Sequence, residues 1–149
     1  MADVMEDPLV SFHYKVDIGG MVVGYFTECS GLDLEYEGAE LKIVSDKGVP
    51  VTVQQPGRVK FTDITLKRGI TDSLDIWDWR KLVEDGKIAE ARVNGSIVLC
   101  KQDTTPVTQW NFERGWPSKV SGPKPKSDSN EIGVEEIVIV HEYIERVGA

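Results

Sequence analysis

The sequence contains little of what most chemical sites are built from. Among 149 residues there are two cysteines and two histidines, and no apolar run approaches the roughly 18 residues of a membrane span. The N-terminal stretch MADVMEDPLV is acidic and does not have the pattern of a signal peptide. We therefore expect no signal peptide, no membrane insertion by this chain, and reduced cysteines that act as small hydrophobic residues.

The residues that could bind a metal ion are scattered. His13, Cys29, Cys100 and His141 stand singly along the chain, without the close pairs that fix a zinc site. On its polar strand face we expect His13 to be solvated, and at the end of an apolar strand we expect His141 to be hydrogen-bonded at the edge of the core. The sequence predicts no metal and no cofactor.

Catalytic patterns are also missing. Ser30 precedes Gly31 outside a G-x-S-x-G motif. The pairs Asp72 with Asp75 and Glu135 with Glu136 have the composition of an acid/base pair, but a helix N-terminus and a solvated strand face are the commoner readings. We expect a protein that is not an enzyme.

The charge balance excludes one large class of partners. Lys and Arg number 17 against 25 Asp and Glu, which gives a formal net charge of −8. A surface that binds nucleic acid needs clustered basic residues. We therefore expect no specific nucleic-acid binding.

What the sequence does contain is a series of short strands. Apolar and polar residues alternate in several segments bounded by Gly, Pro, Asp or Ser, which is typical of half-buried strands. The segments are Ser11–Ile18, Met21–Glu28, Leu32–Tyr36, Thr62–Lys67, Arg92–Cys100, Val107–Glu113 and Glu131–Glu145. Between the last two, residues 115–130 are rich in Gly, Pro, Ser and Lys and predict a loop.

A second kind of hairpin is predicted at residues 36–55. Two apolar segments flank the turn Ser45–Gly48, and Pro50 indicates an edge strand because proline cannot donate to a ladder. Apolar residues occur at both parities, so both faces of this arm are expected to carry them. They are Leu41, Ile43, Val44, Val49, Val51 and Val53.

One convincing helix is predicted at residues 74–85. Asp72 is a good N-cap with Asp75 three residues later, and Gly86 ends the helix. One stripe at helical spacing contains Ile76, Trp79, Leu82 and Val83. Leu74 and Trp77 lie well off that stripe. We therefore predict Trp79 in the core, and Leu74 and Trp77 near a neighbouring subunit.

About nine strands and one helix make a mainly β protein of one domain, residues 1–149. The two-faced arm, the two-faced helix and the apolar run Ile137–Val140 leave more apolar surface than a small monomer usually exposes. Binding is the general explanation. One alternative is a carbohydrate-binding β-sandwich module, in which Trp110, Trp116 and the helix tryptophans Trp77 and Trp79 form a stacking platform for sugars. Such a platform needs several aromatic residues on one exposed strand face, and Trp110 with Phe112 is the only such pair.

An ordered set of motifs carries a more specific interpretation. These are DPLVSFHYKVDIGG, GYFTECSGLDLEYEGAE, QQPGRVKFTDITLKRGITDS, IWDW and WNFERGWPSKVSGPKPKSDSNEIGVEEIVIVHE. The set covers nearly the whole chain, and it resembles the tail-tube (inner tube) proteins of contractile phage tails and phage-like extracellular contractile injection systems. The arm, residues 36–55, matches that family less closely than the flanking motifs.

The resemblance implies a fold and an assembly. The fold would be two packed antiparallel sheets approaching a barrel, with one flanking helix. Six copies would form a ring, and rings would stack into a hollow tube that carries DNA or protein cargo when a surrounding sheath contracts. The implied partners are further copies of the chain, sheath protein, baseplate and spike proteins, and terminator proteins. Assembly would take place in the cytoplasm, within a particle that can be released from the cell.

Under this interpretation the surfaces take roles. Leu74 and Trp77 would lie at an interface between subunits, and the arm would reach an adjacent ring. A predominantly acidic inner wall would keep cargo from binding to it, with Asp63 and Glu135 as candidates for the lining. The alternative for both carboxylates is a solvated position on the outer surface.

Overall fold

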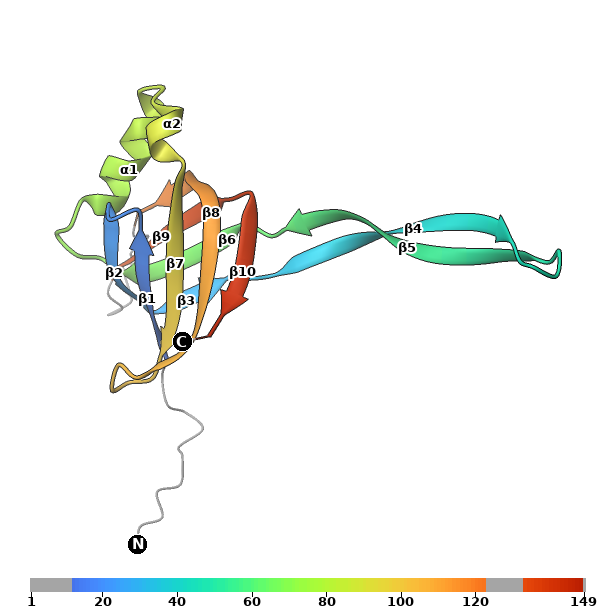
Figure 1. Cartoon of the computed structure of the whole chain (residues 1–149). Helices are drawn as coiled ribbons and strands as arrows, with labels where there is room; N and C mark the ends of the chain where they lie inside the picture. Colours follow the sequence, from blue (N-terminus) through green and yellow to red (C-terminus); the bar gives the residue numbers. More distant parts are fainter. Residues whose placement is uncertain (1–11, 123–132, 149) are drawn as a thin grey trace, which may run out of the picture.

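The computed structural model describes residues 12–122 and 133–148, which form ten strands and two helices (Figure 1). The mainly β prediction is therefore confirmed. In chain order the elements are β1 (His13–Ile18), β2 (Val22–Phe26), β3 (Glu28–Ser30), β4 (Leu34–Val44), β5 (Pro50–Phe61), β6 (Ile64–Gly69), α1 (Asp75–Glu84), α2 (Ile88–Ala91), β7 (Val93–Cys100), β8 (Pro106–Ser121), β9 (Val134–Val140) and β10 (Tyr143–Val147).

Two antiparallel sheets share the long strand β8. Its first half pairs with β7 and β10, and its second half pairs with β9. The full path runs β2-β1-β7-β8-β9-β6-β3. At the far end of this path Thr27 separates β2 from β3, and its backbone N–H donates to the carbonyl of Lys67 on β6. The chain thus changes sheet at Thr27 and within β8, and again between β6 and β7 and between β9 and β10, which brings the inner faces of the two sheets together as a sandwich.

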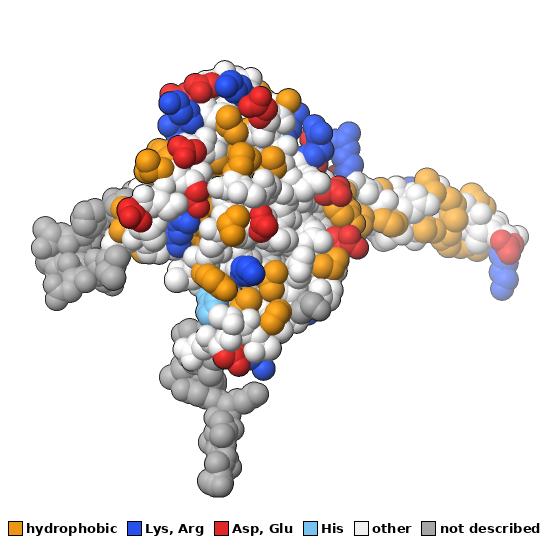
Figure 2. All heavy atoms as spheres, turned by 60° about the vertical axis from the view of Figure 1, so that its left-hand side comes forward, with side chains coloured by type: hydrophobic (Ala, Val, Ile, Leu, Met, Phe, Trp, Pro, Cys, Tyr) orange, Lys and Arg blue, Asp and Glu red, His pale blue; other side chains and the backbone are white. Residues whose placement is uncertain are grey.

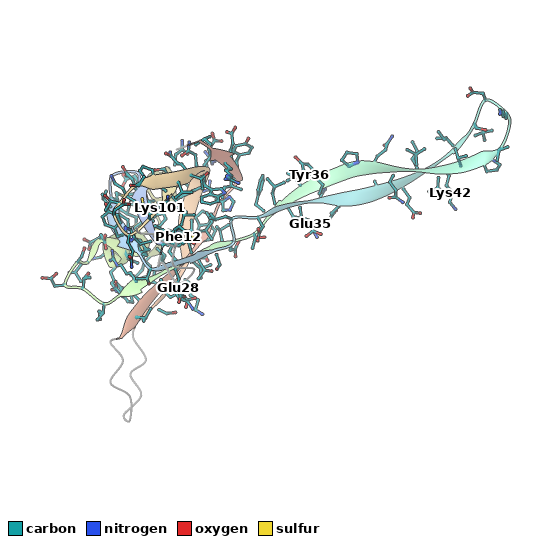
Figure 3. The ribbon with its side chains drawn as sticks, turned by 90° about the horizontal axis from the view of Figure 1, so that it is seen from below. Phe12, Glu28, Glu35, Tyr36, Lys42 and Lys101 are labelled. Atoms are coloured by element: carbon teal, nitrogen blue, oxygen red, sulfur yellow. The ribbon has the colours of Figure 1, made fainter. Side chains whose placement is uncertain are left out.

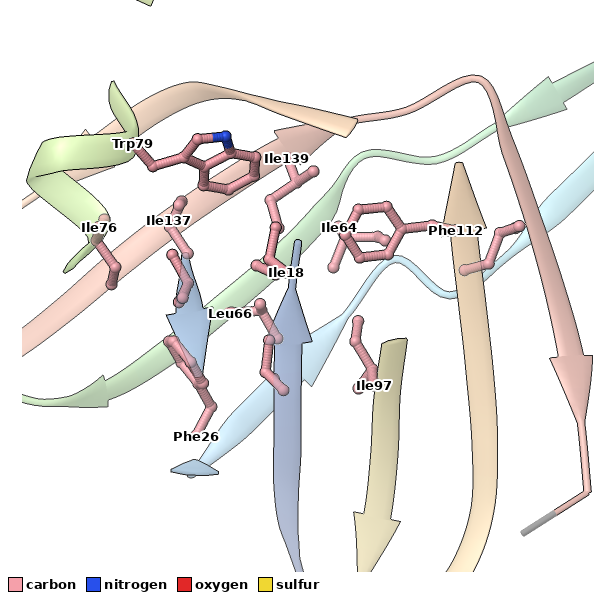
Figure 4. Close-up of a cluster of buried hydrophobic side chains, with 13 residues drawn as sticks. Ile18, Phe26, Ile64, Leu66, Ile76, Trp79, Ile97, Phe112, Ile137 and Ile139 are labelled. Carbon is pink, nitrogen blue, oxygen red and sulfur yellow. The ribbon is translucent and has the colours of Figure 1, made fainter. Parts of the chain in front are cut away.

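The core lies between the inner faces of these sheets. Strand alternation turns Ile18 of β1, Leu66 of β6 and Ile137 of β9 inward, where each is fully buried. Figure 4 shows them meeting side chains from α1 and from the opposite sheet. Each buried aliphatic side chain of this size contributes roughly 1.5–3 kcal/mol relative to exposure. Alternation predicted the inward residues of β1 and β6, whereas the run Ile137–Val140 is apolar at both parities and did not show which residues of β9 face the core.

Helix α1 covers one end of the sandwich (Figure 1). Ile76 and Trp79 are 1% exposed, and the indole Nε1–H of Trp79 donates to the carbonyl of Ala91 at 2.8 Å. The prediction that Trp79 lies in the core of its own subunit is confirmed. Gly86, with φ +78°, follows the helix as expected. The short α2 was not predicted, because four residues are too few to show a helical period.

The predicted N-cap is wrong. The helix begins at Asp75, Leu74 occupies the cap position, and no side chain there caps the helix. Ser73 lies closer, with its Oγ accepting from the backbone N–H of Asp75 at 3.4 Å. The spacing of Asp72 and Asp75 resembled a capping box, but the Asp75 carboxylate is bound instead to Arg68.

Two boundaries near the C-terminus also differ from expectation. Residues 115–121 belong to β8 rather than to a loop, and the remainder of the predicted loop, apart from Gly122, lies outside the described residues. Pro117 is tolerated because residues 116–121 pair only with β9, which leaves their other edge free. The single long strand expected at Glu131–Glu145 is divided at His141, where the chain leaves β9 and turns into β10.

Candidate functional site

The most prominent feature of the molecule is an arm that projects from the sandwich (Figure 1). It consists of β4 and β5, which pair only with each other. Eleven residues of extended strand span about 35 Å. The predicted hairpin is confirmed, but its bounds are wider than residues 36–55, because Pro56 and Gly57 continue β5 through a register shift instead of ending it.

The outer half of the arm is apolar on one face. Leu41 pairs with Val53 and Ile43 pairs with Val51, and side chains of such pairs share a face. The other face carries polar pairs such as Lys42 with Thr52. The expectation of apolar residues on both faces therefore holds only near the tip, where Val44 pairs with Pro50; Val44 and Val49 in the turn are 69% and 53% exposed.

The inner half of the arm is apolar on the opposite face. Leu34 pairs with Phe61 and Tyr36 with Val59, which are even positions of β4, whereas the outer apolar positions of β4 are odd. The register shift between Tyr36 and Gly38 marks the change. The ribbon also twists over between base and tip, since β4 and β5 cross in both Figure 1 and Figure 3.

The change of the apolar positions from one face to the other compensates for the twist of the β4–β5 ribbon. If the apolar side chains stayed on one face of a twisted ribbon, the twist would turn them progressively around the long axis of the arm. A switch of face at mid-length compensates for this turn and brings the apolar side chains back to one side. In the space-filling view of Figure 2, hydrophobic side chains follow one another along the arm. The arm thus presents a nearly continuous apolar strip far from its own core.

The base of the arm is held by an aromatic cluster. The ring of Phe61 at the end of β5 lies 5.5 Å from the His141 ring and 6.0 Å from the Tyr143 ring. His141 is 7% exposed, and its Nε2–H donates to the carbonyl of Thr62 at 3.0 Å. The expected hydrogen-bonded, core-edge histidine is confirmed. In the segment that leads from β3 into β4, the backbone of Gly31 (φ +86°) passes so close to Asp63 that no side chain fits there.

A second exposed apolar surface lies on α1. Leu74 is 64% exposed and Trp77 is 37% exposed, and the guanidinium of Arg80 lies 5.1 Å from the centre of the Trp77 ring. The two tryptophans of the helix therefore have opposite environments, as their angular separation indicates. That Leu74 and Trp77 contact a neighbouring subunit stays a prediction.

A buried ionic cluster fixes α1 against the sheets. Arg68, 6% exposed, donates from Nε to Glu135 at 2.8 Å and from its terminal nitrogens to Asp75 at 2.5 and 3.3 Å. Its guanidinium also lies 5.0 Å from the centre of the Phe26 ring. Burial alone would raise the pKa of Asp75, but the hydrogen bonds and charge of Arg68 outweigh it and lower that pKa.

This cluster corrects the expectation for Glu135. The side chain faces inward from β9, is 4% exposed and is bound to Arg68, so it is not on the solvated strand face that was expected. Sequence reasoning missed Arg68 itself. The signal was available, because Arg68 follows Ile64 and Leu66 at the inward parity of β6.

The outer face of β6 and its neighbours is polar. Asp63 is exposed, and Lys67 lies between two glutamates of the flanking strands, 3.7 Å from Glu28 and 4.0 Å from Glu136. Cross-strand charges of alternating sign largely neutralise one another. Glu136, rather than Glu135, is thus the β9 carboxylate on this surface.

The residues considered for other functions are dispersed. Within residues 12–122 and 133–148, no three His, Cys, Asp or Glu side chains are arranged to hold a metal ion, and no helix is long and apolar enough to cross a membrane. His13 packs edge-on against Tyr25, with ring centres 5.1 Å apart, and Cys29 and Cys100 are both free thiols. Burial raises the pKa of the Cys29 thiol to about 12.

The aromatic platform proposed for sugar binding is wrong. Phe112 is 1% exposed in the core, and Trp110 is partly buried against that core, with the Arg146 guanidinium 5.8 Å from its ring centre. Trp116 is half-buried at the bend of β8. These three side chains do not form an exposed row of aromatic rings.

Comparison with known proteins gives one family and several solved structures of similar fold. The model of the T4-like virus tail tube protein gp19 matches residues 10–145. Among curated proteins, none matches this chain. Several solved structures share its fold at low sequence identity.

The first similar structure is the sheath-tube complex, in the extended state, of the extracellular contractile injection system PVC. The match has 22% identity and a TM-score of 0.70, and covers 98% of this chain and 95% of that chain. The tube-terminating cap of the anti-feeding prophage matches with 22% identity and a TM-score of 0.69 over 100% and 95% of the two chains. Hcp1 from Flavobacterium johnsoniae matches with 17% identity and a TM-score of 0.54 over 92% and 96%.

Proposed function

This chain belongs to the family of T4-like virus tail tube proteins, and from that membership we propose that six copies form a ring and that the rings stack into a hollow tube. The protein would act within a contractile, phage-tail-like particle assembled in the cytoplasm and releasable from the cell. Its partners would be further copies of itself, a sheath protein, and the baseplate, spike and terminator proteins at the ends of the tube.

One observation supports this proposal above the others. The arm exposes an apolar strip that the isolated chain cannot bury, because β4 and β5 pair only with each other. In a monomer, an exposed two-stranded ribbon with apolar side chains promotes aggregation. In an assembly, the same ribbon can be buried against a neighbouring copy. Two further edges, β2 and β3, end the sheet path and are available for neighbours.

We assign both apolar surfaces to contacts between copies of the chain. The arm would reach an adjacent ring through Leu41, Ile43, Val44, Val49, Val51 and Val53, and Leu74 and Trp77 would lie at an interface between subunits. A surface that meets a different surface of the next copy gives an open-ended stack, as a tube requires. A specific contact of this kind buries on the order of 1,000 Å² or more in total.

For the bore we propose the outer face of β3, β6 and β9. This face carries Asp63 and a Lys67 side chain flanked by Glu28 and Glu136, so it offers cargo no unpaired basic cluster. The outer face of β1 and β2, by contrast, exposes Val23 and Tyr25 at 55% and 50%, which suits a contact surface better. A side-chain-resolution map of the tube tests this, and a basic bore or one lined by β1 and β2 would refute it.

Negative-stain microscopy of the purified chain at high concentration tests the assembly. Rings or tubes are expected. A chain that stays strictly monomeric and binds oligosaccharides would overturn the proposal in favour of a carbohydrate module. Deleting residues 41–53 and joining the ends with a short turn should leave soluble rings or monomers, and full-length tubes from that variant would show that the arm does not stack rings.

A further inference from the structure

A hollow beside α1 has the composition to receive the tip of the arm. It has a volume of about 520 Å³, and both α1 and the chain just before it contribute to its wall. Apolar side chains and carboxylates line it together: Met21, Leu74, Trp79 and Leu82 with Ser73, Asp75 and Asp78. Figure 2 shows hydrophobic and acidic side chains lying together on the surface near the helices.

The charged side chains at and near this hollow are mainly carboxylates. Asp72, Asp75 and Asp78 lie within seven residues at the start of α1, and among residues 12–122 and 133–148 only Asp75 of the three is paired with a cation, Arg68. Asp78 is exposed at the hollow and forms no ion pair within the described residues. An apolar floor with an unneutralised carboxylate fits a ligand that is apolar and carries a cation.

The tip of the arm has that chemistry. Val44 and Val49 are among the most exposed apolar residues of the chain, and Lys47 lies between them in the turn. Outward from Leu41 to Val53 the arm carries two lysines and one aspartate, a net charge of +1, opposite in sign to the start of α1.

The two surfaces lie on opposite sides of the molecule. In Figure 1 the arm leaves the sandwich on the right and α1 lies at the upper left. The tip therefore cannot reach the hollow of its own chain. A second copy that lies beyond the end of the arm can place its hollow against the tip. A head-to-tail contact between two different surfaces repeats indefinitely or closes into a ring.

We propose that the arm tip of one copy docks into the hollow beside α1 of a second copy, with Val44 and Val49 against Leu74 and with Lys47 beside Asp78. This inference rests on the proposed function and adds the receiving surface, and with it the role of Leu74. The contact joins the arm to the cluster of Arg68 and Asp75, which holds the wall of the hollow in place.

A charge swap tests the contact. Lys47→Asp and Asp78→Lys alone should each lower the yield of sedimentable tubes about tenfold or more, because each places like charges together. The double variant should restore tubes to near the wild-type yield. Lys101→Asp and Glu90→Lys, two exposed positions away from both surfaces, serve as matched controls and should assemble normally.

Chemical crosslinking gives a second readout that does not depend on assembly yield. Copies with Val49→Cys are mixed with copies with Leu74→Cys, and a short bis-maleimide is added to the assembled tubes. A covalent dimer is expected, whereas Val49→Cys mixed with Lys101→Cys should give none. Native background should be low, because Cys100 is 3% exposed and burial raises the pKa of Cys29 to about 12.

The outcomes separate the two levels of the argument. If wild-type tubes form but the single charge variants assemble normally, or the double variant fails, or the crosslink forms only with Lys101→Cys, the docking site is wrong and the tube function stands. If the wild-type chain forms neither rings nor tubes, the proposed function fails and the docking contact fails with it.

Discussion

Replacing Arg68 with methionine would expose the energetic value of the buried cluster. The change keeps an unbranched apolar stem but removes the hydrogen bond to Glu135 at 2.8 Å and the two to Asp75 at 2.5 and 3.3 Å. It leaves two carboxylates whose side chains are only 6% and 14% exposed. Breaking a buried pair in this way costs about 3–5 kcal/mol.

That cost is a large part of the stability of a domain, which is usually about 5–15 kcal/mol. The matched control is Glu135→Gln, which removes one charge but keeps an oxygen that accepts from Arg68 Nε. Because it turns a cluster of net charge −1 into a neutral one, it should cost less than about 1.5 kcal/mol. Lys67→Met, on the exposed face of the same strand, should stay within about 0.5 kcal/mol of wild type.

The assay is urea denaturation followed by tryptophan fluorescence, with wild type and variants compared in the same assembly state. Unpaired buried carboxylates take up protons more readily than exposed ones. The deficit of Arg68→Met should therefore shrink as the pH is lowered from about 7 to about 5. A deficit below about 1 kcal/mol, or one that does not change over this range, would refute the reasoning.

Three further predictions concern positions that the fold makes sensitive. Gly31→Ala should destabilise by more than about 2 kcal/mol in the same denaturation assay, because φ is +86° and the new Cβ would lie 1.9 Å from the carbonyl oxygen of Asp63; an unchanged midpoint would contradict this. Trp79→Phe should cost about 1–3 kcal/mol, since the buried carbonyl of Ala91 loses its donor, and thermal unfolding that matches wild type would count against it. Because the pKa of Asp75 is lowered in the folded state, its stabilising contribution is complete above its unfolded pKa and is lost as the pH falls through the folded pKa. Wild-type stability should therefore decline at acidic pH, and the decline should be smaller in Asp75→Asn; identical pH profiles would argue against the ion pair.

Where tertiary contacts overrode local signals, the sequence interpretation failed. The capping pattern of Asp72 and Asp75 was locally sound, but Arg68 arrives from β6 and binds the Asp75 carboxylate. Residues 115–121 read as a loop because Gly115 and Pro117 are turn residues, yet pairing with β9 makes them strand. Glu135 was interpreted as solvated because it is a carboxylate next to a second one, Glu136, while its parity places it inside.

Features that depend on residue period and composition could be predicted from the order of residues alone. Alternation indicated which residues of β1 and β6 enter the core, and helical spacing separated a buried Trp79 from an exposed Trp77. The ordered motifs indicated the tail-tube family, which the match over residues 10–145 shows. These features survive in one dimension because burial selects side chains at fixed intervals along a strand or helix.

The placement of these elements relative to one another depends on contacts between distant parts of the chain. The register shift between Tyr36 and Gly38 accompanies the change of the apolar positions from one face of the arm to the other, and the ribbon twists between its base and its tip. The Arg68 cluster joins β6, β9 and α1, which are far apart in the chain. Register, twist and long-range ion pairs depend on which strands meet in space, and the order of residues along a single chain does not record this.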